Sequence, residues 1–235
     1  MLLSLPTLQE ETKRFERKFL IDALSAREVE ALIKSHPAVF REVYYEREVN
    51  NLYLDTYDYK NYWDNVSGSQ RRAKVRLRWY DVRADEVIEP TLEIKIKDGF
   101  VGWKSSHRLA PLRLMKTSRA ALLRAIGESV LLESMRVTLA TREPALLNRY
   151  LRRYFVSADR QFRLTLDREL SYFQPGAGGA PGLESVRDRR HVILEIKYAA
   201  DADTDAAAIA GAFPFRVTKS SKYVSGLASL GVVSS

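Results

Sequence analysis

The chain has 235 residues, a formal net charge of +8 and 46% hydrophobic residues, which suits one sizeable folded domain with a polyanionic partner: nucleic acid, an anionic membrane surface or a phosphorylated small molecule. It contains no cysteine, so disulfides, thiolate metal sites and cysteine nucleophiles are excluded. No stretch approaches the roughly 18 apolar residues of a spanning helix, and Met1–Glu10 lacks the basic region of a signal peptide; we therefore expect a soluble, cytoplasmic single domain over residues 1–235, with its core at about 14–230.

Five segments alternate between apolar and charged residues, which is the period of a β-strand with two different faces. In the first, RFERKFLI, residues Arg14, Glu16 and Lys18 share one face, opposite the apolar face. Two further segments alternate less regularly and are also predicted strands. The seven predicted strands are Arg14–Ile21, Asn50–Thr56, Ala73–Tyr80, Thr91–Lys97, Asn148–Phe155, Phe162–Asp167 and Val192–Tyr198.

Helices are fewer than strands in this prediction. Ser25 is a suitable N-cap for the first helix, and Glu28 stands at the position that completes a capping box. The segment Gln174–Arg190 is rich in Gly and Pro and is predicted to be a long loop between two strands. The predicted helices are Ala26–Lys34, a second from Thr117 or Ser118 to about Glu133, and a third that opens at Ser220 or Ser221 and runs from Lys222 to about Leu230.

The charged faces of these strands repeat Lys and Arg at i, i+2 positions and also include Glu or Asp. For any one strand, a polar face that meets solvent is the simpler interpretation. Taken together, the strands favour an α+β fold: a mainly antiparallel closed β-barrel with peripheral helices, whose charged faces line a tunnel. Like charges gathered in a tunnel need a polyanion, and acidic residues that carry metal, to compensate them. Arg suits phosphate, and carboxylates suit the divalent metals of phosphate sites.

Seven segments of the chain, in order, resemble the VTC domain, the catalytic polyphosphate polymerase domain of the vacuolar transporter chaperone complex. That domain is a member of the triphosphate tunnel metalloenzyme (CYTH-like) superfamily. The resemblance runs from about Arg14 to Leu230, and LRWY, LEIK and SKY are its most specific parts. The seven segments are RFERKFLI, NLYLDT, VRLRWY, LEIKIKDG, FRLTLD, ILEIKY and SKYVSGLASL.

The resemblance implies which residues contact phosphate and which hold a divalent metal, Mn²⁺ or Mg²⁺. The residues expected to contact phosphate and serve catalysis are Lys18, Arg76, Arg78, Lys95, Arg153, Arg163 and Lys222. Basic residues expected to help bind the nucleotide beside them are Lys197, Lys219, Arg14 and Lys74. The expected metal ligand of the late strand is Glu195, helped by Glu16, Glu93 or Asp167.

The expected function is metal-dependent transfer of the terminal phosphate of ATP to a growing polyphosphate chain. Hydrolases of the superfamily open with Glu-x-Glu-x-Lys, whereas this chain has Arg14, Glu16 and Lys18 at those positions, which is closer to the VTC branch. The expected partners are ATP and polyphosphate or pyrophosphate, with no specific nucleic acid. Because the chain shows no SPX-type regulatory domain and no membrane span, coupling to a membrane or to partner subunits stays open.

Other functions remain open on the sequence. If water takes the place of the acceptor phosphate, the same site is an inorganic tripolyphosphatase or nucleoside triphosphatase, and adenylate cyclase is a more distant third. The second class is a non-catalytic module that binds polyphosphate or nucleic acid through the same basic surface. Tyrosines such as Tyr44 and Tyr45 could stack a nucleobase, although core packing explains most of the tyrosines more simply. The histidines His36, His107 and His191 have no metal-ligand spacing.

Overall fold

One antiparallel sheet dominates the molecule. The computed structural model describes residues 14–80, 87, 89–98, 101–113, 118–128, 133–176 and 179–233. In this part of the chain nine strands form a single sheet in the order β1-β9-β7-β6-β2-β3-β4-β5, and β8 pairs with β7 beside that path. The strands are β1 (Arg14–Ile21), β2 (Arg41–Asp55), β3 (Arg71–Tyr80), β4 (Thr91–Asp98), β5 (Val101–Arg108), β6 (Glu143–Val156), β7 (Arg163–Pro175), β8 (Pro181–Asp188) and β9 (Val192–Ala199).

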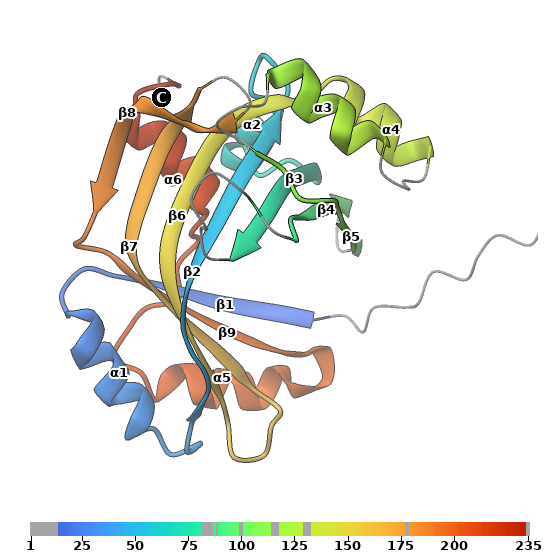
Figure 1. Cartoon of the computed structure of the whole chain (residues 1–235). Helices are drawn as coiled ribbons and strands as arrows, with labels where there is room; N and C mark the ends of the chain where they lie inside the picture. The colour runs from blue at the N-terminus through green and yellow to red at the C-terminus, as the bar shows by residue number, and fades with distance from the viewer. Residues whose placement is uncertain are drawn as a thin grey trace, which may run out of the picture.

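The sheet is strongly curved, and β2, β6 and β7 run through both halves of the molecule (Figure 1). Register shifts interrupt the β2–β6 ladder between Tyr44 and Arg47, and the β6–β7 ladder between Arg149 and Leu151. An extra residue on one strand bends it and increases its twist. These irregularities therefore let three long strands turn from one half of the molecule into the other.

Helices cover the sheet on both faces. The helices are α1 (Ala26–Lys34), α2 (Lys60–Val66), α3 (Arg119–Glu128), α4 (Glu133–Ala140), α5 (Asp203–Gly211) and α6 (Lys222–Ser229), with a short 3-10 helix at Ala200–Ala202. No helix in the described ranges combines the length and the apolar character needed to cross a membrane.

Two apolar clusters hold helices on the outer face. Phe19 of β1 and Leu164 of β7 are fully buried and pack with Ile33 of α1. Leu77 of β3 packs with Leu122 of α3 in a second cluster. Each such side chain stabilises the fold by about 1.5–3 kcal/mol. The alternation seen in the sequence therefore sends its apolar side outward, under the helices.

A third apolar cluster lies on the opposite face of the sheet. Tyr223 and Leu227 of α6 pack there against Tyr150 of β6 and Tyr172 of β7. Gly226 of α6 is needed at this contact, because a Cβ atom there would lie 2.6 Å from side-chain atoms of Leu146 and Tyr172. Helix α6 is thus seated on the same face as the charged residues of the strands.

The predicted α+β class with a mainly antiparallel sheet is confirmed, and so is the first helix. Ser25 accepts from the backbone N–H of Glu28, whose carboxylate accepts from the Ser25 backbone in return. The predicted loop Gln174–Arg190 is wrong in part, because β8 lies within it and pairs with β7. Most of the side chains of β8 are exposed, so its sequence has no apolar face to reveal it.

The second predicted helix is also corrected. The structure has two helices in that region, α3 and α4, and Thr117 and residues 129–132 lie outside the described residues. Two further elements, β5 and α5, were not predicted at all. β5 has the sequence VGWKSSHR, whose polar residues do not alternate with apolar ones.

Candidate functional site

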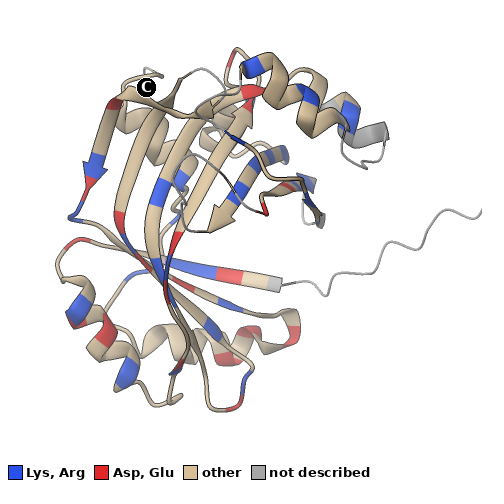
Figure 2. Cartoon of the chain, in the orientation of Figure 1, with Lys and Arg blue, Asp and Glu red and all other residues tan. Residues whose placement is uncertain are grey.

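The face of the sheet that carries α6, here called the inner face, also carries nearly all of the charged residues singled out in the sequence. Residues paired across neighbouring strands point to the same side of a sheet, so the ladders define this face. Lys18 pairs with Glu195, which pairs with Thr165 on β7. On the other half, Arg76 pairs with Tyr53 and with Glu93. Figure 2 shows basic and acidic positions side by side along these strands rather than separated into patches.

The first group of inner-face charges is here called the Glu195 cluster: Lys18, Arg152, Asp167, Glu195, Lys197 and Lys222. Arg152 donates two hydrogen bonds to Asp167, at 2.5 and 2.7 Å. Lys222 Nζ lies 2.6 Å from Asp167 Oδ2 and 3.7 Å from Glu195 Oε1. Glu195 also pairs with Lys18 at 3.5 Å and with Lys197 at 3.4 Å. Two acids thus share four basic side chains.

Burial and charge act in opposite directions on this cluster. Burial alone raises the pKa of Glu195, but the charges of Lys222 and Lys18 outweigh it and hold that pKa well below its usual value. Burial likewise lowers the pKa of Lys222, whereas Asp167 and Glu195 raise it above the normal lysine value. The cluster therefore favours the charged forms of Glu195 and of Lys222.

The second group is here called the Glu93 cluster: Arg76, Arg78, Glu93 and Lys104. Arg76 Nε donates to Glu93 at 2.7 Å, and Lys104 Nζ lies 3.0 Å from the other carboxylate oxygen. Arg78 Nη1 is 3.7 Å from Glu93. Burial raises the pKa of Glu93, but the charges of Arg76 and Arg78 more than offset this and lower it strongly. Glu93 is thus an anion surrounded by three cations.

Two neutral side chains fix the arginines of the Glu93 cluster. Arg78 Nε donates to Asn51 Oδ1 at 2.9 Å, and Asn51 in turn donates to Asn148. Arg76 Nη1 donates to the Tyr53 hydroxyl at 3.4 Å. Asn51 is fully buried, so the direction of the Arg78 guanidinium is set by the β2–β6 pair beneath it.

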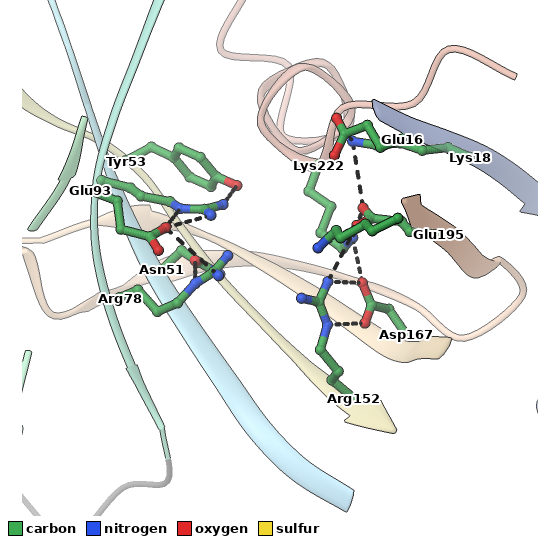
Figure 3. Close-up of polar contacts among 12 residues, drawn as sticks. Glu16, Lys18, Asn51, Tyr53, Arg78, Glu93, Arg152, Asp167, Glu195 and Lys222 are labelled. Atoms are coloured by element: carbon green, nitrogen blue, oxygen red, sulfur yellow. Dashed lines mark hydrogen bonds and ion pairs between the residues drawn. The ribbon is translucent and has the colours of Figure 1, made fainter. Parts of the chain in front are cut away.

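The two clusters face each other across the inner face (Figure 3). Charges on strands far apart in the strand order act on one another. Lys18, and more weakly Lys95 of β4, lower the pKa of Glu16 on β1, and after burial Lys18 of β1 lowers that of Lys74 on β3. The curved sheet therefore brings β1 near β3 and β4. Among the described strands, no ladder joins the terminal strands β1 and β5.

Helix α6 is held in place at the edge of this site. Ser221 caps the helix, and its hydroxyl accepts from Lys74 Nζ at 3.0 Å. The Tyr223 hydroxyl donates to the fully buried Asp55, which also accepts backbone N–H groups at the start of α2. Arg142 donates to the same carboxylate at 3.1 Å. This network anchors α6, so Lys222 is presented to Asp167 and Glu195 by a fixed helix.

Comparisons with known proteins agree with this geometry. The family model described as the VTC domain matches residues 13–231. The chain belongs to the VTC domain family. Its members handle phosphate and triphosphate substrates in a tunnel fold. No curated protein matches the sequence of this VTC domain.

Solved structures show the same fold at low sequence identity. A candidate adenylyl cyclase from Hippeastrum, described as having a dominant triphosphatase activity, is 13% identical with a TM-score of 0.50, over 92% of this chain and 96% of that one. A candidate adenylate cyclase from Bacillus halodurans is 13% identical with a TM-score of 0.53, over 88% and 92% of the two chains. The predicted tunnel fold of this VTC domain is therefore confirmed.

The structure brings together most of the residues that the sequence singled out. Lys18, Arg76, Arg78, Lys197 and Lys222 lie in the two clusters, and so do all the predicted metal ligands except Glu16, which pairs with Lys18 at 3.2 Å. The other predicted residues placed on the inner face are Lys74, Lys95 and Arg163.

For the three remaining predicted residues, no contact with the inner-face charges is found in the described part of the chain. Arg153 points to the outer face, where it pairs with Glu42 at 2.8 Å and with Glu30 of α1. Lys219 is exposed and makes no hydrogen bond or ion pair with the described residues. The side chain of Arg14 lies outside the described part of the chain.

Sequence reasoning missed two basic residues of the VTC domain site, Arg152 and Lys104. In NRYLRRYF the two adjacent arginines lie on opposite faces, and the phase of the strand selects between them. Asn148 and Tyr150 share the phase of Arg152, so their alternation is the signal that could have identified it. Lys104 lies on β5, which the sequence did not reveal as a strand.

The acids of the VTC domain do not form a metal cage by themselves. No group of three acidic or histidine side chains in the described ranges is close enough together to hold an ion. Magnesium, however, is commonly bound through one or two carboxylates together with substrate phosphates and water. Glu195 and Glu16 both pair with Lys18, and they lie close enough for the charge of Glu195 to raise the pKa of Glu16, which Lys18 lowers. This pair fits such a shared site.

Proposed function

We propose that this VTC domain binds the triphosphate of ATP along its inner face and transfers the terminal phosphate to a polyphosphate chain, with Mn²⁺ or Mg²⁺. The observation that supports this proposal is the pair of facing clusters. Each combines fixed cations with a carboxylate, and a chain of phosphates has the charge and the length to contact both. In such transfers, positioning and charge neutralisation do most of the work, so no protein nucleophile is required.

The basic residues have distinct roles in this proposal. Arg76 and Arg78, directed by Tyr53 and Asn51, bind phosphate oxygens through their planar forks. Lys18, Lys222 and Arg152 neutralise charge as it shifts toward the leaving oxygen. Arg152 replaces Arg153 in this role, because Arg152 is the one that faces Asp167.

The buried polar groups of the inner face support a ligand there. Asn148 Nδ2 is buried and has no hydrogen-bond partner among the described residues, although it lies on the strand between the two clusters. A buried donor without a partner costs roughly 1–3 kcal/mol. A bound phosphate oxygen within its reach would remove that cost.

The divalent ion would be held by Glu195 and Glu16. When bound, it supplies charge neutralisation of the phosphate oxygens. Glu93 and Asp167, which the sequence also favoured as ligands, each accept an arginine hydrogen bond, at 2.7 and 2.5 Å, whereas the cations around Glu195 lie 3.4–4.0 Å from it. We therefore assign these two carboxylates to the positioning of basic residues.

The proposal is tested by incubating the purified protein with ATP and Mn²⁺ or Mg²⁺, with and without a short polyphosphate primer, and resolving the products by gel and phosphorus NMR. Long phosphate chains together with ADP are expected. Free orthophosphate without chains would instead identify a triphosphatase, and retention of polyphosphate without turnover would identify a binding module. The Arg78→Ala variant, which loses one phosphate contact, is the control that ties the activity to this site.

Lys74 makes phosphate binding depend on pH. Burial, followed by the charges of Lys18 and Arg76, lowers the pKa of Lys74 to about 7, while Glu16 raises it and Lys95 lowers it. Above pH 7 the free protein therefore holds Lys74 largely neutral. A bound polyanion favours the charged amine, so binding takes up a proton, and affinity for tripolyphosphate is expected to fall by up to about tenfold per pH unit above pH 7.

Comparison with Lys74→Met isolates this effect from the titration of the phosphates. Calorimetry in buffers of different ionisation enthalpy counts the protons taken up, and the variant should take up fewer above pH 7.

The effect of Lys74 on the stability of the fold has a defined sign as well. The pKa of Lys74 in the folded protein lies below the unfolded value of about 10.4, so the buried charge lowers the free energy of unfolding. This destabilisation is greatest below pH 7 and disappears as the pH rises toward 10.4. The variant should be the more stable protein at pH 6, and equal proton uptake by both proteins would contradict the assignment.

A further inference from the structure

Arg47 is an inner-face arginine with no acidic partner among the described residues. It lies on β2, and its Cα partner on β6 is Arg152, so two arginines stand directly opposite each other on the same side of the sheet. Like charges in this arrangement destabilise a sheet. Arg152 is compensated by Asp167, whereas Arg47 forms no ion pair with any described residue.

Three tyrosines surround the Arg47 guanidinium. Its central carbon lies 5.0 Å from the ring centroid of Tyr44 and 4.9 Å from those of Tyr80 and Tyr154. Burial, then Tyr80, raises the pKa of the Tyr154 hydroxyl to about 12, so the phenol is neutral at physiological pH. Cation–π contacts hold the guanidinium in place. They leave its formal charge uncompensated.

Two buried polar atoms beside these rings have no hydrogen-bond partner in the described part of the chain: Arg47 Nε and Thr165 Oγ1. Both lie beside Tyr154, because Thr165 is its Cα partner on β7 and the Arg47 guanidinium lies over its ring. One is a cationic donor and the other is a hydroxyl. Buried groups of this kind are nearly always satisfied in native proteins, and a phosphate oxyanion is a hydrogen-bond acceptor for either group.

The Arg47 group, which consists of Arg47, Tyr44, Tyr80, Tyr154 and Thr165, lies on the inner face beside the Glu195 cluster. Thr165 lies between Asp167 and Arg163 on β7, and it also pairs with Glu195 on β9. Tyr44 and Tyr80 are 57% and 42% exposed, whereas Arg152 and Asp167 are buried. The Arg47 group therefore lies where the inner face passes from the buried clusters to solvent.

We propose that Arg47, held by Tyr44, Tyr80 and Tyr154 and joined by Thr165, is an outer anion subsite for polyphosphate chains longer than a triphosphate. This inference rests on the proposed function, since the two clusters bind the first phosphates. The ligand class is the phosphate oxyanion of a linear phosphoanhydride chain. The subsite makes the protein prefer long chains to short ones.

The test measures the affinity of the full chain for tripolyphosphate and for long-chain polyphosphate by calorimetry. The wild type is expected to bind long chains more tightly. Arg47→Ala should weaken long-chain binding about 10- to 100-fold, which corresponds to one charge-assisted contact, and should change tripolyphosphate binding less than about twofold. Arg168→Ala is the matched control: it removes one arginine that pairs with Glu46 on the outer face and should change neither affinity.

Each outcome has a distinct meaning. A wild type that binds neither ligand overturns the proposed function itself. The outer subsite alone is overturned if the wild type binds both ligands and Arg47→Ala binds long chains as tightly as the wild type does. It is also overturned if Arg47→Ala lowers the affinity for both ligands by the same factor. Arg47→Lys guards against loss of the fold: it retains the charge between the rings but loses the fork. Its long-chain affinity should fall between those of wild type and Arg47→Ala.

Discussion

Replacing Lys222 with methionine is expected to have the largest effect of any single substitution at this site. Lys222 is 9% exposed and lies against both Asp167 and Glu195. Removing a buried cation leaves two buried carboxylates with less compensation, which costs about 3–5 kcal/mol of folding free energy. Turnover of ATP should also fall by about 10²- to 10³-fold, because a fixed cation beside the reacting phosphates is lost.

Denaturant unfolding and steady-state kinetics measure these two effects separately. Excess tripolyphosphate does not replace the missing Lys222 amine. The loss of turnover should therefore persist under conditions in which the variant is fully folded. Lys34→Met is the matched control, since Lys34 is an exposed lysine on α1 that pairs with Glu30 and should leave both quantities close to wild type. A folded Lys222→Met variant with wild-type turnover would remove Lys222 from the phosphate site.

Glu195→Gln is expected to abolish the dependence of turnover on the divalent ion, or to weaken it severely. Four basic side chains of the Glu195 cluster compensate this carboxylate and keep it ionised, so the carboxylate is ready to bind a cation once phosphate engages those bases. The amide is nearly the same size but has no charge. Turnover at saturating Mn²⁺ should fall by about 10²-fold or more, by analogy with the loss of other electrostatic catalytic groups.

Metal-free phosphate binding should respond in the opposite direction. Without the Glu195 charge, Lys18, Lys197 and Lys222 face the ligand with less internal compensation, so tripolyphosphate is expected to bind more tightly in EDTA. Glu184→Gln is the control, because Glu184 is an exposed residue of the edge strand β8. A Glu195→Gln variant that keeps the metal titration of the wild type would remove Glu195 from the metal site.

The sequence was sufficient to predict the strands whose two faces differ in chemistry. In Arg14–Ile21 the alternation of charged and apolar residues reports directly that one face is buried under α1 and α5 and the other meets charges. In β8 most side chains are exposed, and in β5 the polar residues do not alternate, so no period distinguishes these edge strands from loop. Their pairing is decided by backbone hydrogen bonds to neighbours, which leave little trace in local sequence.

The site was predictable by residue type more than by contact. Basic residues at i, i+2 positions on β3 indicate a common face, and the structure places Arg76 and Arg78 there. The choice between Arg152 and Arg153 follows from the phase that Asn148 and Tyr150 set along β6. The pairing of Asp167 with Arg152, in contrast, follows from cross-strand register, which no single segment contains.

The carboxylates of the inner face have a consequence for selectivity. An anion that binds at either cluster must displace Glu93, Asp167 or Glu195 from an arginine or lysine that already has a partner. A singly charged anion replaces one such contact with a similar one and gains little. A chain with charge on every phosphate replaces contacts in both clusters in one binding event, so its gain accumulates along its length. We infer that this arrangement selects its ligands by linear charge density, and that chloride, acetate and monophosphates are poor competitors at concentrations where polyphosphate binds.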